Sequence, residues 1–318
     1  MSADEPLSAQ IEALVRAGAL RRKTAAVRLE AEIRRREEAL RQTFRRYVSP
    51  RVADKILEDA QLRDALLSTA DARAHAVVLF ADLRGFTSLA EQLPPQHVVP
   101  LLNEYFSLLT EITFKYEGTV FHMAGDCLML GFGVPFEQPD SPQRAVSAAR
   151  EMLASFAELS RSWRERYQVE AGLGIGINEG DVVAGNVGSS AYMNYTIIGD
   201  TVNIAARLEA ANKQLGTRIC VGESVATRVA GFTGRPVGEL LLRGRSEPLS
   251  AFEALSRDEF NDPATQAYLR AFRKLEEGDP TATSAFAALL GLRSDDQLVS
   301  FHLKRLLNGA SGVRIALD

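Results

Sequence analysis

Two aspartates in apolar surroundings are the residues of this chain that point most directly to chemistry. Asp82 ends the β-rich run HAVVLFADL, and Asp126 follows Gly125 inside FHMAGDCLMLGFG. Unpaired carboxylates are costly to bury, and two carboxylates held close together raise each other's pKa. One strand-end aspartate is typical of a turn or a helix N-cap. Two of them, each near a glycine, favour a divalent cation such as Mg²⁺ or Mn²⁺, which prefers oxygen ligands.

The elements around these aspartates predict that they meet. The apolar patterns indicate a strand ending at Asp82, a hairpin with Gly125-Asp126 at its tip, and helices over 95–116, 145–167 and 201–215. The order βαββαβ predicts an α+β fold with a ferredoxin-like layer, a sheet covered on one face by helices. If this sheet pairs the first strand with the hairpin, both carboxylates lie at one edge.

Two glycine-containing segments could face phosphates. The segment LRGFTS opens a helix after Asp82, and its glycine would let backbone N–H groups, with Phe86 and Thr87 beside them, point at a phosphate. An ordinary strand-to-helix turn explains this segment equally well. The segment GLGIGINEGDVVAGN is not a dinucleotide loop, because Ile177 stands where GxGxxG needs its third glycine, and no GxxxxGK[ST] occurs.

Composition excludes several classes of protein. The 318 residues are 46% hydrophobic and 25% charged with a net charge of −4, which argues against a general nucleic-acid binder. The only cysteines, Cys127 and Cys220, form neither a disulfide framework nor a zinc pattern. The N-terminus lacks the layout of a signal peptide, and no apolar run approaches the ~20 residues that span a bilayer. We therefore expect a cytoplasmic protein with no transmembrane segment.

The chain divides into three expected parts. Residues 1–70 read as a helical region in which Ala26, Ile33, Leu40 and Tyr47 recur at spacing seven. This stripe suits either a short signalling coiled coil or an amphipathic helix packed on its own domain. Residues 71–257 form the main domain, and 258–318 form a helical, tetratricopeptide-like extension. One such unit cannot bury its own apolar face, so we expect the extension to pack on something else.

Four segments of the main domain carry a resemblance: VLFADLRGFTSLAEQL, AGDCLMLGFG, GDVVAGNVGS and YTIIGDTVNIAARLEA. Together, in this order and spacing, they resemble the catalytic domain of class III nucleotidyl cyclases, the adenylate and guanylate cyclases. The resemblance covers roughly residues 75–255. FRRYVSP, just upstream, resembles the segment that joins bacterial cyclase domains to their signalling helices.

The resemblance implies a homodimer with two sites at the subunit interface. Asp82 and Asp126 would bind two Mg²⁺ or Mn²⁺ ions, assisted by the Leu83 carbonyl. From the other subunit, Asn203 would orient the ribose and Arg207 would hold charge developing on the α-phosphate. Arg243 falls where the family usually has a lysine that binds the terminal phosphates, and arginine can grip phosphate with two hydrogen bonds.

The nucleotide base is less directly implied. Family members that use ATP usually read adenine with a lysine and an aspartate, and the corresponding positions here are His122 and Thr196. A threonine at this position resembles the pattern of a bacterial subgroup of the family, and its hydroxyl both donates and accepts hydrogen bonds. A neutral imidazole can still meet adenine, although His122 could equally be a strand residue without base contact. We expect conversion of ATP to 3′,5′-cyclic AMP; the alternatives are a GTP or pyrimidine cyclase and a non-catalytic regulatory dimer.

Overall fold

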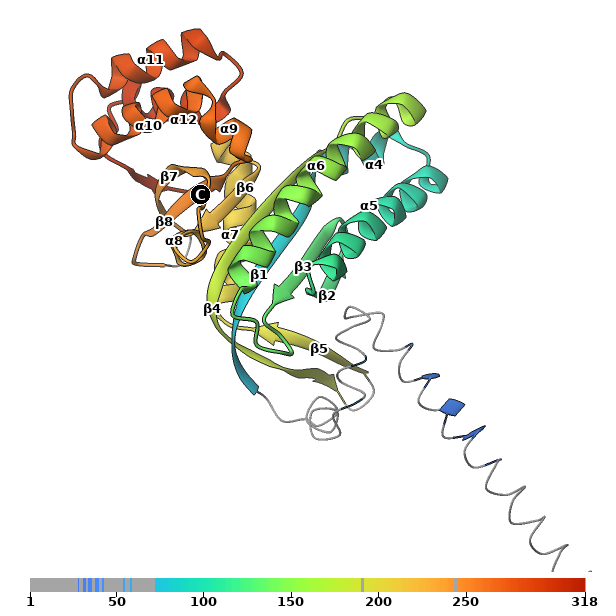
Figure 1. Cartoon of the computed structure of the whole chain (residues 1–318). Helices are drawn as coiled ribbons and strands as arrows, with labels where there is room; N and C mark the ends of the chain where they lie inside the picture. Colours follow the sequence, from blue (N-terminus) through green and yellow to red (C-terminus); the bar gives the residue numbers. More distant parts are fainter. Residues whose placement is uncertain are drawn as a thin grey trace, which may run out of the picture.

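A computed structural model gives the fold of the chain (Figure 1). The structure describes residues 72–189, 192–242 and 245–317, together with scattered positions between 28 and 58. The expected N-terminal helix, its possible coiled coil and Arg243 therefore lie outside the described residues. Within the described part of the chain, no helix is both long enough and apolar enough to cross a membrane.

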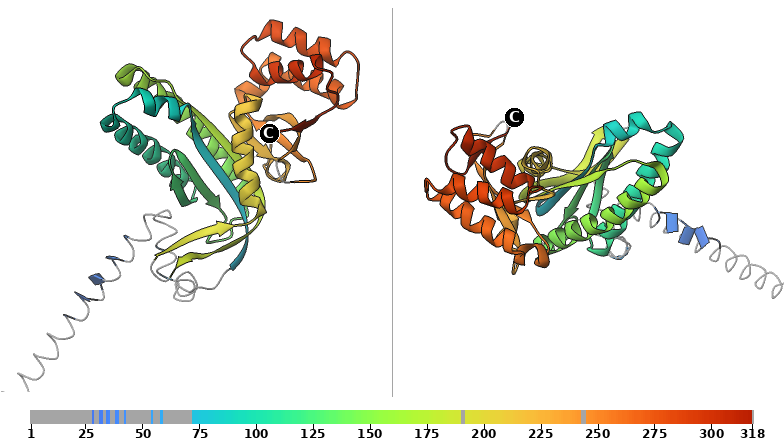
Figure 2. Two further views of the ribbon diagram at one scale, coloured as in Figure 1. Left: turned by 180° about the vertical axis from the view of Figure 1, so that it is seen from behind. Right: turned by 90° about the horizontal axis from the view of Figure 1, so that it is seen from above.

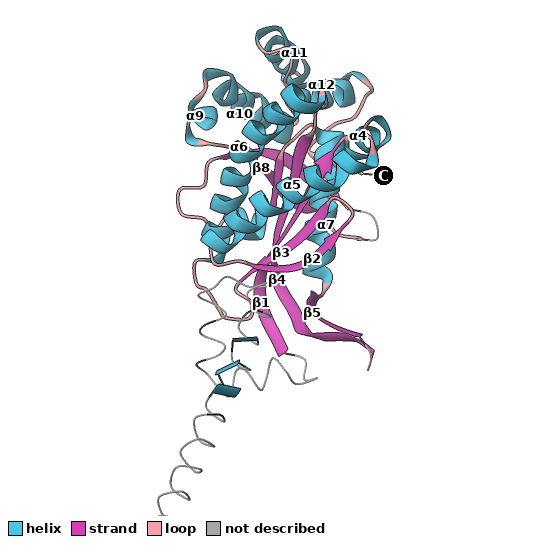
Figure 3. Cartoon of the chain, turned by 90° about the vertical axis from the view of Figure 1, so that its right-hand side faces the viewer, coloured by secondary structure: helices cyan, strands magenta, loops and turns pink. Residues whose placement is uncertain are grey.

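A single sheet is the framework of the described residues (Figure 3). Its strands run in the order β2-β3-β1-β4-β6-β8-β7-β9, and β5 pairs with β4 outside this path. The strands are β1 (Ala72–Arg84), β2 (Thr119–Ala124), β3 (Cys127–Phe132), β4 (Gly172–Ser189), β5 (Tyr192–Ile198), β6 (Ile219–Gly222), β7 (Gly234–Leu241), β8 (Leu249–Ala254) and β9 (Arg314–Ala316). The mixture of sheet and helices confirms the expected α+β class.

The helices agree closely with the sequence pattern in the main domain. α6 begins at Ser141 rather than Ala145, because Pro142 is accepted in the first turn of a helix. The described helices are α4 (Phe86–Gln92), α5 (Pro95–Lys115), α6 (Ser141–Tyr167), α7 (Asp200–Leu215), α8 (Glu223–Ala226), α9 (Arg257–Asn261), α10 (Pro263–Glu276), α11 (Ala282–Leu292) and α12 (Gln297–Leu307).

Strand β1 is covered by helices on both faces. Successive strand residues point to opposite faces, and Val77 and Leu79 are buried in one apolar core with residues of α5 and α6. Val78 is buried in a different core, with Ala205 of α7. The expectation of helices on one face therefore holds for α5 and α6 but is wrong for α7, which lies on the opposite face (Figure 2).

Glycines in β4 explain why α7 can lie there. Gly176 stands in GLGIG, where the larger residues Ile175 and Ile177 point into the core under α5 and α6. A Cβ atom added at Gly176 would lie 2.1 Å from the backbone nitrogen of Glu209 and 2.3 Å from the backbone oxygen of Ala205. The backbone of α7 thus rests directly on β4, which only glycine permits at this position.

Replacing this glycine tests the packing. Gly176→Ala should lower the free energy of unfolding by about 3 kcal/mol, because the methyl group meets helix backbone that cannot rotate away. Urea unfolding followed by circular dichroism measures the change. Gly291→Ala is the control, since an added Cβ meets nothing within 4 Å there. Equal stability of Gly176→Ala and the parent chain would show that α7 does not press on β4.

Candidate active site

The turn between β2 and β3 brings the two predicted aspartates together. Ala81 of β1 pairs with Leu128 of β3, so Asp82 lies beside the start of β3 and beside Asp126 in the turn before it. Burial, and then the negative charge of Asp126, raises the pKa of Asp82 to about 6. Burial also raises the pKa of Asp126. The two carboxylates therefore repel each other in a partly dry environment, as the sequence predicts.

A third carboxylate, which sequence reasoning missed, lies close behind this pair. Glu209 projects from α7 toward β4, where a Cβ added at Gly174 would lie 2.5 Å from its Oε1 atom. Burial, and then the charge of Asp82, raises the pKa of Glu209 to about 7 against the opposing effect of Arg84. The alternating glycines of GLGIG were the available signal, because they mark a strand that another element approaches closely.

These carboxylates suit a divalent cation whose remaining ligands come from the substrate. Among the described residues, no group of three or more His, Cys, Asp or Glu side chains is arranged to hold a metal ion by itself. Mg²⁺ is usually held by one or two carboxylates together with substrate phosphates and water. Asp82 and Asp126 repel each other, and a bound ion would relieve this repulsion by supplying positive charge between them.

Asn203 and Arg207 occupy one face of α7, one turn apart. Asn203 is exposed and Arg207 is half-buried. Arg207 is not among the charged groups of the described residues that shift the pKa of Asp82 or of Asp126.

Comparison with known proteins then decides the family. The profile of the adenylate and guanylate cyclase catalytic domain matches residues 69–252, which contain β1 to β8 almost completely. The chain belongs to this family. Adenylate cyclase 1 of Rhizobium meliloti is 30% identical over 222 residues, and an adenylate cyclase of Anabaena cylindrica is 30% identical over 181 residues. These matches cover 67% and 55% of this chain but only 32% and 36% of the two relatives.

Solved structures show the same relationship. The adenylyl cyclase CyaB of P. aeruginosa superposes on this chain with a TM-score of 0.56 at 31% identity, over 59% of this chain and 96% of that one. The guanylyl cyclase Cya2 superposes with a TM-score of 0.53, also at 31% identity, over 57% and 92% of the two chains. The fold is therefore that of the cyclase domain, and similarity alone does not choose between adenine and guanine.

The positions predicted to read the base lie on β2 and β5. His122 is exposed on β2 beside an irregularity in its pairing with β3, and Thr196 pairs with Gly185 in the hairpin of β4 and β5. The residues just before them, Phe121 and Tyr195, have ring centroids 6.0 Å apart. The strands that carry His122 and Thr196 therefore approach each other at Phe121 and Tyr195, although the two positions lie 74 residues apart in sequence (196 − 122).

Three further predicted positions, Leu83, Phe86 and Thr87, lie at the turn after β1. Gly85 adopts a left-handed backbone with φ of 82°, and α4 starts immediately after it at Phe86, with Thr87 exposed. Leu83 is buried with its backbone paired to Leu173 of β4. Arg243 lies outside the described residues, but Arg245 nearby forms an ion pair with Asp200 at the start of α7. This turn and the start of α7 are therefore the boundaries of the candidate site.

Proposed function

We propose that this chain is a homodimeric, metal-dependent cyclase that converts ATP to 3′,5′-cyclic AMP and pyrophosphate. The observation that carries the proposal is the pair Asp82 and Asp126, whose charges repel at the end of β1. A divalent cation would supply the positive charge that this pair lacks, and a second subunit would complete the site around the substrate. The adenylate cyclases of Rhizobium meliloti and Anabaena cylindrica among the relatives favour ATP.

Each residue has a distinct task in the proposed reaction. Asp82 and Asp126, with the Leu83 carbonyl, hold Mg²⁺ or Mn²⁺; such ions lower the pKa of the ribose 3′-OH and neutralise the triphosphate. Asn203 of the second subunit orients the ribose so that its 3′-oxygen faces the α-phosphorus. As the 3′-OH loses its proton to water, the new P–O bond forms and the bond to pyrophosphate breaks, Arg207 of that subunit stabilises the charge on the α-phosphate oxygens.

The phosphates and the base have their own proposed contacts. The backbone at Phe86 and Thr87 and the side chain of Arg243 would bind the terminal phosphates. His122 and Thr196 would meet the edge of adenine, with the threonine hydroxyl able to donate or accept. In this assignment the phosphate contacts supply affinity for any nucleoside triphosphate, and the base contacts alone select ATP.

A product assay tests the proposal. The full chain, incubated separately with each of the four nucleoside triphosphates and Mn²⁺, should form cyclic AMP from ATP at least ~10-fold faster than any other cyclic nucleotide, because only the base contacts discriminate. Chromatography of the products gives the rates. Dominant formation of cyclic GMP would establish the second candidate, a guanylate cyclase, which similarity to Cya2 favours. No conversion of any triphosphate, with Mn²⁺ or when the assay is repeated with Mg²⁺, would leave only a non-catalytic dimer.

A further inference from the structure

The helices after the cyclase match share one apolar core with α7. The match ends at residue 252, and the helical extension begins with α9 at Arg257. Figure 1 shows α10, α11 and α12 stacked beside β7 and above α7. A stripe at helical spacing on α7 is buried in the same core as side chains of α10, α11 and α12: Ile204, Leu208, Ala211 and Leu215 with Tyr268, Phe272, Phe286, Leu298 and Val299.

This stripe adjoins the two residues proposed to act on the substrate. Ile204 follows Asn203 and Leu208 follows Arg207, so each polar residue has a neighbour buried in the core with the extension. On its other side α7 is held by the sheet, where Asn212 donates a hydrogen bond of 2.8 Å to the Ile175 carbonyl. The helix therefore lies between the sheet and the extension, and both determine its position.

The end of α7 touches the start of α12. Gly216 caps α7 with a left-handed backbone, φ of 70°, and a Cβ atom added there would lie 2.1 Å from the Cβ of Gln297. Gln297 is the first residue of α12, and Asp296 before it accepts hydrogen bonds from the backbone of Leu298 and Val299. The two helix ends thus meet with no space for even a methyl group.

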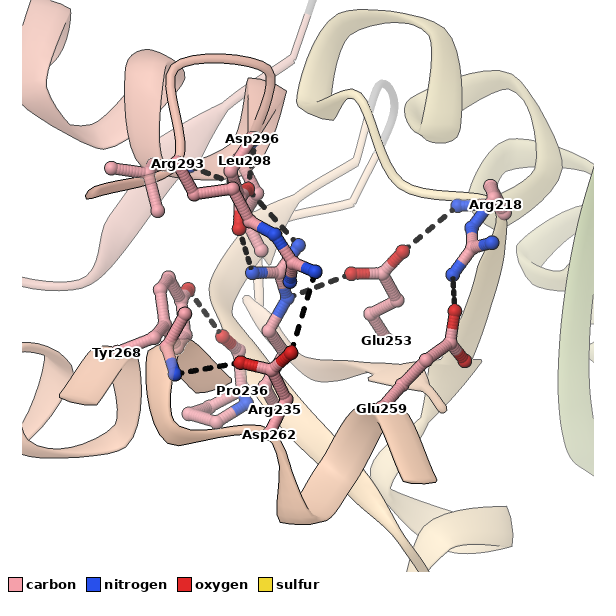
Figure 4. Close-up of polar contacts among 12 residues, drawn as sticks. Arg218, Arg235, Pro236, Glu253, Glu259, Asp262, Tyr268, Arg293, Asp296 and Leu298 are labelled. Atoms are coloured by element: carbon pink, nitrogen blue, oxygen red, sulfur yellow. Dashed lines mark hydrogen bonds and ion pairs between the residues drawn. The ribbon is translucent and has the colours of Figure 1, made fainter. Parts of the chain in front are cut away.

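A buried arginine fastens the same end of α12 to the sheet (Figure 4). Arg235 of β7 is 8% exposed and donates to Glu253 of β8 at 2.8 Å and to Asp296 at 2.5 and 3.1 Å. Its guanidinium also lies 4.8 Å from the ring centroid of Tyr268, whose hydroxyl donates to the Pro236 carbonyl at 2.7 Å. Paired and nearly dry, this arginine holds α10 and α12 in one arrangement.

The extension also faces the strand that carries Asp82. A cavity of about 400 Å³ at the junction is lined by Arg84, Gly216, Arg235 and Gln297, among others. Arg84, two residues after Asp82, donates to the Thr217 carbonyl just beyond α7. The extension could therefore act on either half of the site, through α7 or through β1, and the burial of Ile204 and Leu208 makes α7 the larger contact.

We infer that the extension, residues 257–317, positions α7 so that Asn203 and Arg207 meet the substrate bound to the other subunit. Gly216, Gln297, Arg235 and Asp296 are the positioning residues, because they hold α12 against the end of α7. This inference rests on the proposed function. In a cyclase domain with this extension, a shift of the extension would move Asn203 and Arg207 relative to the substrate on the other subunit.

Gly216→Ala is the variant that tests the inference. The new methyl group would push α12 away from α7, and we expect kcat to fall by about 10- to 100-fold with KM within about threefold, since substrate still binds the metal half. Gly278→Ala is the matched control, because Gly278 has a nearly identical φ of 69° but nothing within 4 Å of its added Cβ. It should retain the parent activity.

Second-site rescue separates this contact from general damage. Gln297→Gly removes the Cβ atom that meets residue 216, so it should restore kcat in Gly216→Ala to within about threefold of the parent chain. A second comparison uses two substitutions that each affect an ion pair. Asp296→Asn keeps a helix N-cap but weakens the buried pair with Arg235. Its control, Arg314→Met, removes an exposed ion pair with Glu239. Only Asp296→Asn should lower kcat.

Mixing of variant subunits shows which half of the site the extension serves. Gly216→Ala should recover activity when mixed with Asp82→Ala, because one site then combines intact aspartates with an intact α7. It should recover none when mixed with Arg207→Ala, because every site then has a damaged α7. The reverse pattern would place the effect on β1, and no recovery in either mixture would indicate general misfolding; each result would overturn the inference.

The shared site is checked first in the same experiment. Recovery between Asp82→Ala and Arg207→Ala supports the proposed function, and its absence with subunit exchange verified would overturn both proposals. If that recovery is seen and Gly216→Ala keeps full kcat, only the role of the extension is wrong. The two failures are therefore distinguishable.

Discussion

Asp82→Ala and Arg207→Ala should each be at least ~10³-fold less active than the parent chain, and a mixture of the two should regain activity. The first variant loses a carboxylate from the repelling pair at the end of β1, and the second loses the charge proposed to stabilise the α-phosphate in the transition state. In a heterodimer of the two, one site draws intact aspartates from one chain and an intact arginine from the other.

The size of the recovery follows from subunit counting. Equal amounts of the two chains, fully exchanged, give about half heterodimers, each with one working site of two, so the mixture should reach about a quarter of the parent activity. Cyclic AMP formation is measured before and after exchange, and exchange itself is followed with differently tagged chains. A site contained within one chain predicts no recovery at all.

A control with the same two substitutions on one chain sharpens the result. A heterodimer of the parent chain with Asp82→Ala/Arg207→Ala has no intact site if each site is shared. An excess of the double variant should therefore suppress parent activity. If each chain held a complete site, the parent chain would keep its activity in such heterodimers.

The sequence predicts the aspartate pair because local signals agree there. An apolar strand ending in Asp82 and a hairpin tip at Gly125-Asp126 leave few arrangements, and the register of β1 with β3 brings them together. The sequence does not indicate Glu209, because the position of this side chain depends on the depth at which α7 packs against β4. That depth is set by contacts between residues 174–176 and 205–209, which no local pattern encodes.

The place of the extension was also beyond sequence reasoning. The helical periodicity of α10 and α12 predicts that their apolar faces need a partner, but it does not name the partner. The decisive contacts join Arg235 to Glu253 and to Asp296, 18 and 61 positions away, and Gly216 to Gln297. A buried arginine in an apolar strand gives no sign of which acids it will meet.

Asp82→Asn should abolish activity and yet raise the stability of the metal-free protein at pH 7.5. The pKa of Asp82 is raised from 3.8 to about 6, so the folded state binds this proton more tightly than the unfolded chain. A raised carboxyl pKa favours the folded state at low pH, and that contribution is lost as pH rises from about 4 through about 6. Above this window the ionised carboxylate works against the fold.

Asparagine keeps the shape of the side chain and removes the charge. The shift alone corresponds to about 3 kcal/mol, but Asp82 is only partly buried, so solvent screening reduces the expected gain to about 1 kcal/mol. For a chain of 318 residues, that gain raises Tm by about 1–2 °C. Thermal unfolding in a chelator at pH 7.5 should show the difference, and the same comparison at pH 4.5 should show only about a third of it, because the folded carboxyl is then protonated.

With added Mn²⁺, the parent chain should become more stable than Asp82→Asn. An ion that binds only the folded parent chain stabilises it by mass action, whereas the variant has lost one of the two carboxylates that would hold the ion. Binding must also displace the proton from Asp82, so the stabilisation by Mn²⁺ should grow as pH rises from 5 to 7. Equal stabilisation of both proteins by Mn²⁺ at pH 7.5 would mean that Asp82 is not a metal ligand. Its raised pKa would then reflect burial and Asp126 alone.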